Sequence, residues 1–215
     1  MYRLADKLLE QLKKLIRREF NRLGIIAFDE LNASRVSLET TELFGRLKRE
    51  NERLYLKVAK KAYDDAVVAA KAAGYEGSPE NRINSAWVVA LLGAYNFVSG
   101  YLYESEAERK RLRLGEQIMT AREYQNRTLY NDSVRRTANL WWTQAAHYML
   151  EAVDNATIDG YKDSGVGKVM WHTNIDGREC KVCRERNGVI YDITKVPPKP
   201  HRNCRCYTTP VPKNK

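Results

Sequence analysis

Apolar residues recur every three or four positions through most of the first 165 residues, which is the spacing of one face of an α-helix. In the first run, leucines and an isoleucine repeat on one side, with lysines and arginines between them. Ser78, Pro79 and Glu80 supply an N-cap, a first-turn proline and an acidic first turn for a later helix. The pattern predicts an antiparallel domain of about four to six helices. They are expected over residues 4–16, 37–74, 78–98, 104–125 and 132–159.

The pattern changes after Tyr161. A glycine-containing break is followed by Val169, Trp171 and Thr173, which alternate as in a β-strand. Asn187-Gly188 predicts a tight hairpin turn, and five of the six prolines lie at positions 197–212, where they exclude a helix. The expected fold is mainly α, with a helical domain over residues 1–165 and a small β-rich module over residues 166–215.

The composition predicts a folded protein without a transmembrane helix or a signal peptide. Of its 215 residues, 43% are hydrophobic and 30% are charged, which is enough apolar material for a core. No stretch approaches the ~18 consecutive apolar residues of a transmembrane helix. Residues 1–20 lack the apolar segment of a signal peptide. We therefore expect the chain in the cytoplasm, where thiols stay reduced.

Positive charge is concentrated in the predicted C-terminal module. The formal net charge is +10, and residues 166–215 hold eleven basic and four acidic residues, so that only +3 is left for the rest. Such asymmetry indicates an acidic partner, either double-stranded DNA or an acidic patch on another protein, with solubility alone as the alternative. The expected contacts are Lys181, Arg184, Arg186, Arg202 and Arg205. If most of them neutralise DNA phosphates, log affinity should fall against log salt with a slope of roughly −3 to −5.

The four cysteines form the strongest chemical pattern in the chain. They occur as Cys180-x2-Cys183 and Cys204-x-Cys206, with His201 three residues before Cys204. Zinc takes four Cys or His ligands tetrahedrally, and a two-residue gap lets a turn direct both side chains at one ion. We predict a structural zinc bound by Cys180, Cys183, His201 and Cys204, with Cys206 as the reserve ligand. A disulfide pair and inert buried thiols are the alternatives.

A small, proline-rich module needs such a metal, because a piece of about fifty residues gains too little from its own core. Nothing in the sequence indicates catalysis. His147 and His172 have no serine or carboxylate in an obvious triad order, and there is no phosphate loop, dinucleotide fingerprint or zinc-protease helix. We expect His147 in the core, His172 facing solvent, and no enzymatic activity.

The segment 104–125 carries a second group of charges. Arg109 and Arg113 are four residues apart and should share a helix face, while Glu106 and Lys110 should pair beside them. This face is either a self-paired, solvated surface or a docking face for an acidic partner.

The spacing of the C-terminal residues resembles that of a known family. The pattern is Trp171-x-Thr173-x2-Asp176-x3-Cys180-x2-Cys183, then Asn187-Gly188 before Ile190-Tyr191, then Pro197-Pro198-x-Pro200-His201-x2-Cys204-Arg205-Cys206. It is similar to the C-terminal motif of the phage Mu F-like head morphogenesis proteins, also called minor head or minor capsid proteins. Upstream, the pattern Tyr101-Leu102-Tyr103 with Glu106-x-Glu108-Arg109-Lys110-Arg111-x-Arg113-x2-Glu116 resembles the middle region of members from tailed phages of Gram-positive hosts.

The resemblance extends over residues 101–212 and has two departures. Many members carry Arg-Thr-Glu before the last long helix, whereas this chain has Arg136-Thr137-Ala138. Many also have His-Pro before the final cysteines, where Arg202 follows His201 here. The missing glutamate puts any role tied to it in doubt.

The resemblance implies a low-copy virion component inside the head near the portal vertex, present in the host cytoplasm during assembly. Its implied partners are the portal protein, capsid or scaffold proteins, and packaged double-stranded DNA, with roles in head assembly and in packaging or ejection of DNA. Two other hypotheses stay open from the residues. One is a zinc-knuckle protein that binds nucleic acid outside any virion, and the other is a zinc-assisted nuclease or toxin-like effector.

Overall fold

The structure of the chain is a computed structural model, and it describes residues 3–94, 102–174 and 179–213. The predicted class, mainly α with a small β-rich C-terminal module, is confirmed. The helices are α1 (Arg3–Ile25), η1 (Phe28–Glu30, a 3-10 turn), α2 (Ala33–Ala72), α3 (Ser85–Gly93), α4 (Tyr103–Glu123), α5 (Arg127–Asp163) and α6 (Lys181–Arg186). The strands are β1 (Lys168–His172), β2 (Ile190–Asp192) and β3 (Tyr207–Pro210).

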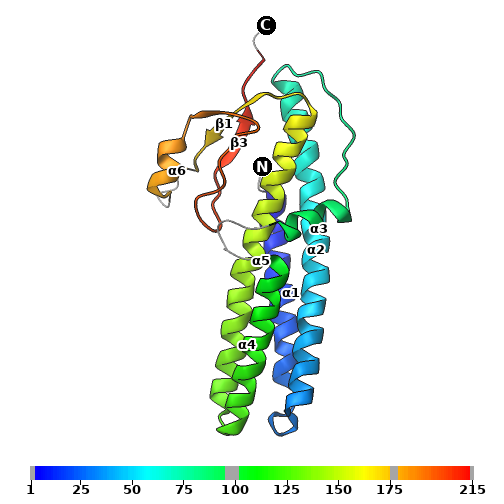
Figure 1. The fold of residues 1–215 in the computed structure, drawn as a ribbon, viewed down its shortest axis with the longest axis vertical. Helices are drawn as coiled ribbons and strands as arrows, with labels where there is room; N and C mark the ends of the chain where they lie inside the picture. The colour runs from blue at the N-terminus through cyan, green and yellow to red at the C-terminus, as the bar shows by residue number, and fades with distance from the viewer. Residues whose placement is uncertain (1–2, 95–101, 175–178, 214–215) are drawn as a thin grey trace.

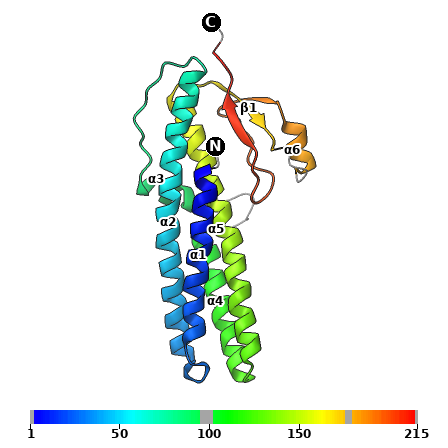
Figure 2. The same ribbon diagram turned by 180° about the vertical axis from the view of Figure 1, so that it is seen from behind.

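The four long helices α1, α2, α4 and α5 lie side by side with their axes roughly parallel (Figure 1). Helices α2 and α5 extend beyond α1 and α4 at one end. The sheet lies beside this projecting part and α6 lies on the outer side of the sheet, as the reverse view also shows (Figure 2). Among the described helices, no segment combines the length and the apolar character that crossing a lipid bilayer requires.

Aromatic side chains fill the centre of the helical bundle. Trp141 of α5 is fully buried and packs edge-on against Phe44 of α2, with 5.2 Å between ring centroids. Tyr103 lies on its other side, and the Tyr103 hydroxyl accepts a hydrogen bond from the Asn51 amide at 3.1 Å. Rings of this size remove much apolar area from water, and pairing a buried hydroxyl avoids the cost of leaving it unsatisfied.

Three helices begin at an asparagine. The side-chain oxygens of Asn32, Asn84 and Asn126 each accept the backbone N–H of the third residue along, at 2.9 to 3.0 Å. Each cap satisfies one of the N–H groups that a helix leaves free in its first turn.

These caps correct three predicted boundaries. Helix α2 begins before Ser37, and α5 begins before Asp132, because the asparagine caps lie upstream of both residues. The cap predicted at Ser78 is wrong, since the chain stays irregular until Asn84 and α3 begins at Ser85. The expected continuation of this helix to Val98 lies outside the described residues. The helices expected near residues 4–16 and 104–125 are confirmed as α1 and α4.

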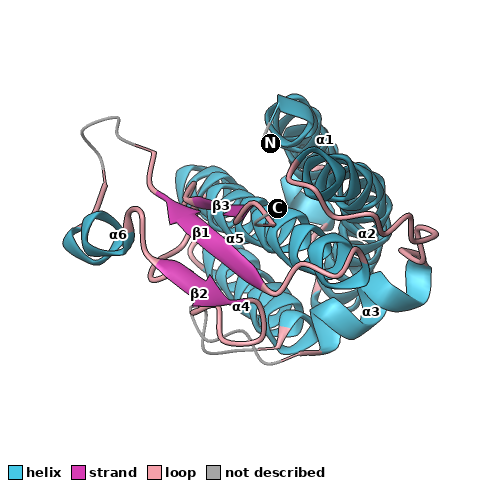
Figure 3. Cartoon of the chain, turned by 90° about the horizontal axis from the view of Figure 1, so that it is seen from above, coloured by secondary structure: helices cyan, strands magenta, loops and turns pink. Residues whose placement is uncertain are grey.

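The sheet has the order β2-β1-β3, and both pairings are antiparallel (Figure 3). The strand predicted from Val169 and Trp171 is its central strand, and these two side chains are buried on it. The Asn187-Gly188 pair does not form the predicted hairpin turn. Gly188, at φ +79°, follows the end of α6 and donates its N–H to the Trp171 carbonyl at 2.8 Å, so that β1 and β2 are joined through α6.

The C-terminal module shares buried side chains with the long helices. Tyr161 of α5 packs with Val169, Ile193 and alanines of α2, and its hydroxyl donates to the Thr208 carbonyl at 3.2 Å. Tyr75 donates in the same way to the backbone of residue 211. The chain changes from helix to strand where the domain boundary was expected, but the division at residue 165 stays a prediction.

Helices α2 and α5 approach closely at Gly160. A Cβ atom at this position would lie 2.8 Å from the Tyr63 carbonyl oxygen and 2.9 Å from the Ala66 Cβ, which is closer than real Cβ atoms come to such neighbours. The contact therefore requires glycine at 160 and a small residue at 66.

Candidate metal centre

The five predicted ligands come together beside α6. Cys180 caps this helix and Cys183 lies within it, while His201, Cys204 and Cys206 come from the loop that leads into β3. Two overlapping groups have their donor atoms within 4.8 Å of one another: Cys180, Cys183 and His201, and Cys183, Cys204 and Cys206. Cys183 belongs to both groups and is therefore the central donor of the site.

The measured spacings fit a tetrahedral ion. The Cys183 sulfur lies 3.5 Å from the Cys204 sulfur and 3.5 Å from His201 Nε2. Zinc–sulfur and zinc–nitrogen bonds of ~2.3 and ~2.0 Å give tetrahedral edges of about 3.5 to 3.8 Å. All four cysteines are free thiols, and a separation of 3.5 Å is well beyond a disulfide bond. The residues present could hold a metal ion.

Hydrogen bonds hold the turn of α6 that carries the first two ligands. The Cys180 sulfur accepts the backbone N–H of Cys183 at 3.4 Å. The Thr173 hydroxyl donates to the Cys183 carbonyl, and the Thr173 N–H donates to the Asn187 side chain at 2.9 Å. Strand β1 thus leads directly into a residue that orients the ligand turn, and Asn187 serves this turn rather than a hairpin.

His201 is oriented with one ring nitrogen toward the cysteines. Its Nδ1 lies 3.0 Å from the Arg202 carbonyl oxygen, so Nδ1 carries the proton and donates it there. This tautomer leaves the lone pair of Nε2 on the side of Cys183, which is the arrangement that metal-bound histidines use.

Burial determines the protonation of the thiols. Cys183, Cys204 and Cys206 are each at most 3% exposed. Burial raises the pKa of Cys183 and of Cys204. Burial also acts to raise the pKa of Cys206, but its contacts with Cys183 and Cys204, together with the Lys199 charge, lower that pKa on balance. Buried thiols of this kind become thiolates when a cation offsets their charge. Cys180 and His201 are only half-buried, and His201 lines a cavity with Cys183, Cys204 and Cys206, which gives an ion a path inward.

Two of the predicted DNA contacts lie on α6 and are strongly exposed. The side chains of Lys181 and Arg184 are 89% and 72% accessible. Each forms one long ion pair, Lys181 with Glu185 at 3.8 Å and Arg184 with Glu179 at 3.7 Å. Ion pairs of exposed cations contribute little, so most of the surface of both side chains stays open to a partner.

The other predicted contacts are not gathered at the same surface. Arg186 donates to a backbone carbonyl at 2.8 Å and lies 5.2 Å over the Trp171 ring, and Lys199 lies 5.2 Å over the same ring. Arg205 forms an ion pair with Asp6 of α1 at 3.0 Å. Arg186 and Arg205 thus have partners within the chain, although Arg205 also lines the cavity beside His201 and the buried cysteines.

Arg202 lies instead with the charged face of α4. Arg109 and Arg113 share one face, as predicted, and they line a cavity together with Arg202. The predicted pair of Glu106 and Lys110 is present at 2.7 Å. No pattern in the sequence indicates that the loop after His201 reaches α4.

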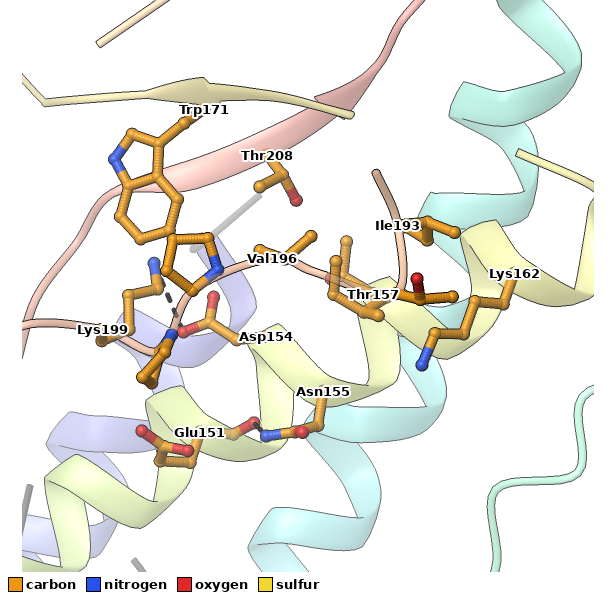
Figure 4. A pocket seen from close by; sticks show the side chains of 14 residues that line it. Glu151, Asp154, Asn155, Thr157, Lys162, Trp171, Ile193, Val196, Lys199 and Thr208 are labelled. Carbon is orange, nitrogen blue, oxygen red and sulfur yellow. Dashed lines mark hydrogen bonds and ion pairs between the residues drawn. The ribbon is translucent and has the colours of Figure 1, made fainter. Parts of the chain in front are cut away.

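A further cavity, of about 330 Å³, separates α5 from the loop before the ligands (Figure 4). Glu151 and Asp154 of α5 face Lys199, and the Lys199 ammonium lies 3.4 Å from an Asp154 oxygen. Burial raises the pKa of Glu151 to about 7, and the Asp154 charge adds to the effect. His147, one turn before Glu151, is buried as predicted, and burial lowers its pKa to about 4.

Comparison of the chain with protein-family models, with curated proteins and with solved structures found no match.

Proposed function

We propose that the chain is a minor head protein of a tailed phage, of the Mu F-like type. In this proposal it is a low-copy virion component inside the head near the portal vertex, and it is in the host cytoplasm during assembly. Its partners are the portal protein and capsid or scaffold proteins. Packaged double-stranded DNA is a further partner.

The observation that carries the proposal is the convergence of the motif residues on one site. Thr173 and Asn187 bond each other and the first ligand turn, although fourteen residues separate them in sequence. Arg186 bonds the Pro198 carbonyl and covers Trp171, which ties the proline segment to β1. A pattern that resembles a family motif is expected to form one structural unit, and this one does, apart from Asp176, which lies outside the described residues.

The metal in this proposal is zinc. Thiolate and imidazole donors at tetrahedral spacing suit Zn²⁺, whereas Mg²⁺ and Ca²⁺ prefer oxygen. Three of the five candidate donors are buried, which fits a closed, structural site. Zinc binding in small modules contributes roughly 10 to 16 kcal/mol, more than this module gains from its own core.

Purified heads of the phage or induced prophage that encodes the chain provide the test. Quantitative mass spectrometry should detect the chain in the heads at a small fraction of the major capsid protein. Cys183→Ser should be lost from heads, because it removes the central ligand. Val182→Ser changes an exposed neighbour on the same helix to the same residue and should be incorporated normally.

Two results would contradict the proposal. One is a wild-type chain that is abundant in lysed cells and missing from DNA-filled heads. The other is recovery of the chain with nucleic acid outside the heads, which would favour the zinc-knuckle hypothesis.

A further inference from the structure

We propose that the cavity between α4, α5 and the metal-binding loop is a binding site for a compact polyphosphate, an anion with two or three linked phosphoryl groups. The cavity measures about 210 Å³. That is below the roughly 300 to 1,000 Å³ of sites for drug-sized ligands, so its ligand is small. Its lining residues are Glu106, Arg109, Lys110, Arg113, Gln117, Arg136, Thr137, Leu140 and Arg202.

The cavity carries a strong excess of positive charge. Five of its lining side chains are cations, contributed by α4, α5 and the loop, against a single carboxylate, Glu106. Arginine is well suited to phosphate because its planar guanidinium offers paired N–H donors to two oxygens. Four of the five cations are arginines, and the neutral Gln117 and Thr137 can add hydrogen bonds to phosphoryl oxygens.

The one carboxylate is already engaged. Glu106 is 1% exposed and is held by Arg109 at 2.9 Å and by Lys110 at 2.7 Å. Burial acts to raise the pKa of Glu106, but hydrogen bonds from Lys110 and Arg109 hold it below its usual value. The carboxylate is therefore ionised and shared by two cations, and its charge does not offset the rest of the cavity.

Three arginines remain without an acidic partner. Within the described part of the chain, no carboxylate lies within ion-pair distance of Arg113, Arg136 or Arg202. They come from three separate elements and face one cavity, so their mutual repulsion opposes the packing of α4, α5 and the loop. A ligand with several closely spaced negative charges would remove that repulsion, whereas a singly charged anion would offset only part of it.

The loop arginine also acts electrostatically on a buried residue of α5. After burial, the Arg202 charge is the second cause that lowers the pKa of His147. Arg202 thus lies close enough to act electrostatically on α5 as well as on the cavity. The site is built from tertiary contacts, and none of its three elements would form it alone.

Calorimetric titration of the full, metal-loaded chain with inorganic triphosphate tests the proposal. At about 150 mM salt we expect one site per chain, with Arg113→Gln and Arg136→Gln each weakening affinity at least tenfold. Arg135→Gln is the matched control, because Arg135 neighbours Arg136 on α5, is exposed, pairs with Asp132 and does not line the cavity. Its affinity should stay within twofold of wild type.

Melting temperatures, sulfate binding and metal content serve as controls for the titration. Without ligand, both cavity variants should melt at or above the wild-type temperature, since they remove repulsion from exposed positions. Sulfate should bind at least tenfold more weakly than triphosphate, and bound metal should be assayed before and after titration, because triphosphate can chelate. Loss of metal during the titration would reject the binding signal as chelation.

Three outcomes would overturn the proposal. Equal effects of Arg135→Gln and Arg136→Gln would mean diffuse charge attraction. Equal affinity for sulfate and triphosphate would mean an adventitious anion only. If duplex DNA binds in a way that depends on Arg136 and triphosphate does not bind, the cavity contacts a nucleic-acid backbone instead of a compact ligand.

Discussion

Replacing Glu151 with glutamine should make the protein more stable, and the gain should increase with pH. The Glu151 side chain is 21% exposed and faces the acidic Asp154 as well as Lys199 and His147. Its pKa rises from a reference of 4.5 to about 7 in the folded chain. The folded protein therefore binds more protons than the unfolded chain between these values, and stability is lost as pH rises through this window.

The size of the effect follows from linkage. A shift from 4.5 to about 7 costs roughly 1.4 kcal/mol at pH 5.5 and about 3 kcal/mol at pH 8.5, when each pKa unit is worth ~1.4 kcal/mol. Glutamine keeps the shape of the side chain and does not titrate. The stability advantage of Glu151→Gln over wild type should therefore grow by about 2 kcal/mol between these two pH values.

Urea unfolding at pH 5.5, 7.0 and 8.5 with excess zinc measures this growth. His147 lies 3.8 Å from Glu151, but burial lowers its pKa to about 4, so it is neutral in both folded proteins from pH 5.5 upward and its contribution cancels in the difference. Glu116→Gln, at an exposed position of α4, is the control and should show no growth. A difference between Glu151→Gln and wild type that stays constant from pH 5.5 to 8.5 would refute the reasoning, whatever its absolute value.

Three further predictions concern packing, metal and charge. Gly160→Ala should lower the free energy of unfolding by about 2 kcal/mol in urea, because its Cβ would collide with α2, whereas Gly115→Ala should be neutral or stabilising, because 3.8 Å separates its Cβ from the nearest contact. Metal analysis should give one zinc per chain, and chelation should remove hydrogen-exchange protection from β1 and β3 while most helical circular dichroism remains. The chain should bind duplex DNA with a salt slope near −2, because Lys181 and Arg184 are the strongly exposed cations of α6, and charge removal at both should weaken binding and reduce the slope.

Local signals in the sequence were sufficient wherever one segment determines its own structure. The leucine spacing of α1 and the alternation around Trp171 led to the right elements, because burial of one face determines both patterns. Helix starts were harder. Asn32, Asn84 and Asn126 compete with serines and aspartates of similar capping strength, and tertiary packing decides among them. Asn187-Gly188 has strong turn propensity, but propensity does not say which elements the turn connects.

The metal site and the basic cavity also differ in how far the sequence could predict them. The cysteine spacing encodes a local geometry, so the convergence of Cys180 and Cys183 could be predicted before the fold was known. The basic cavity could not, because Arg113, Arg136 and Arg202 are far apart in sequence and meet only through the packing of α4, α5 and the loop. Charge counted along the chain grouped Arg202 with the other basic residues of the C-terminal module, whereas its side chain lines a cavity with residues of α4 and α5.

The two longest helices, α2 and α5, determine how far apart the ends of the molecule are held. At ~1.5 Å per residue, the 40 residues of α2 and the 37 of α5 are each about 55 to 60 Å long. The loops that join α1 to α2 and α4 to α5 lie at one end of these helices and the sheet lies at the other, so continuous helix sets the distance between them. Removing seven residues, close to two helical turns, from each of the four long helices would shorten that distance by about 10 Å with little rotation of one end against the other.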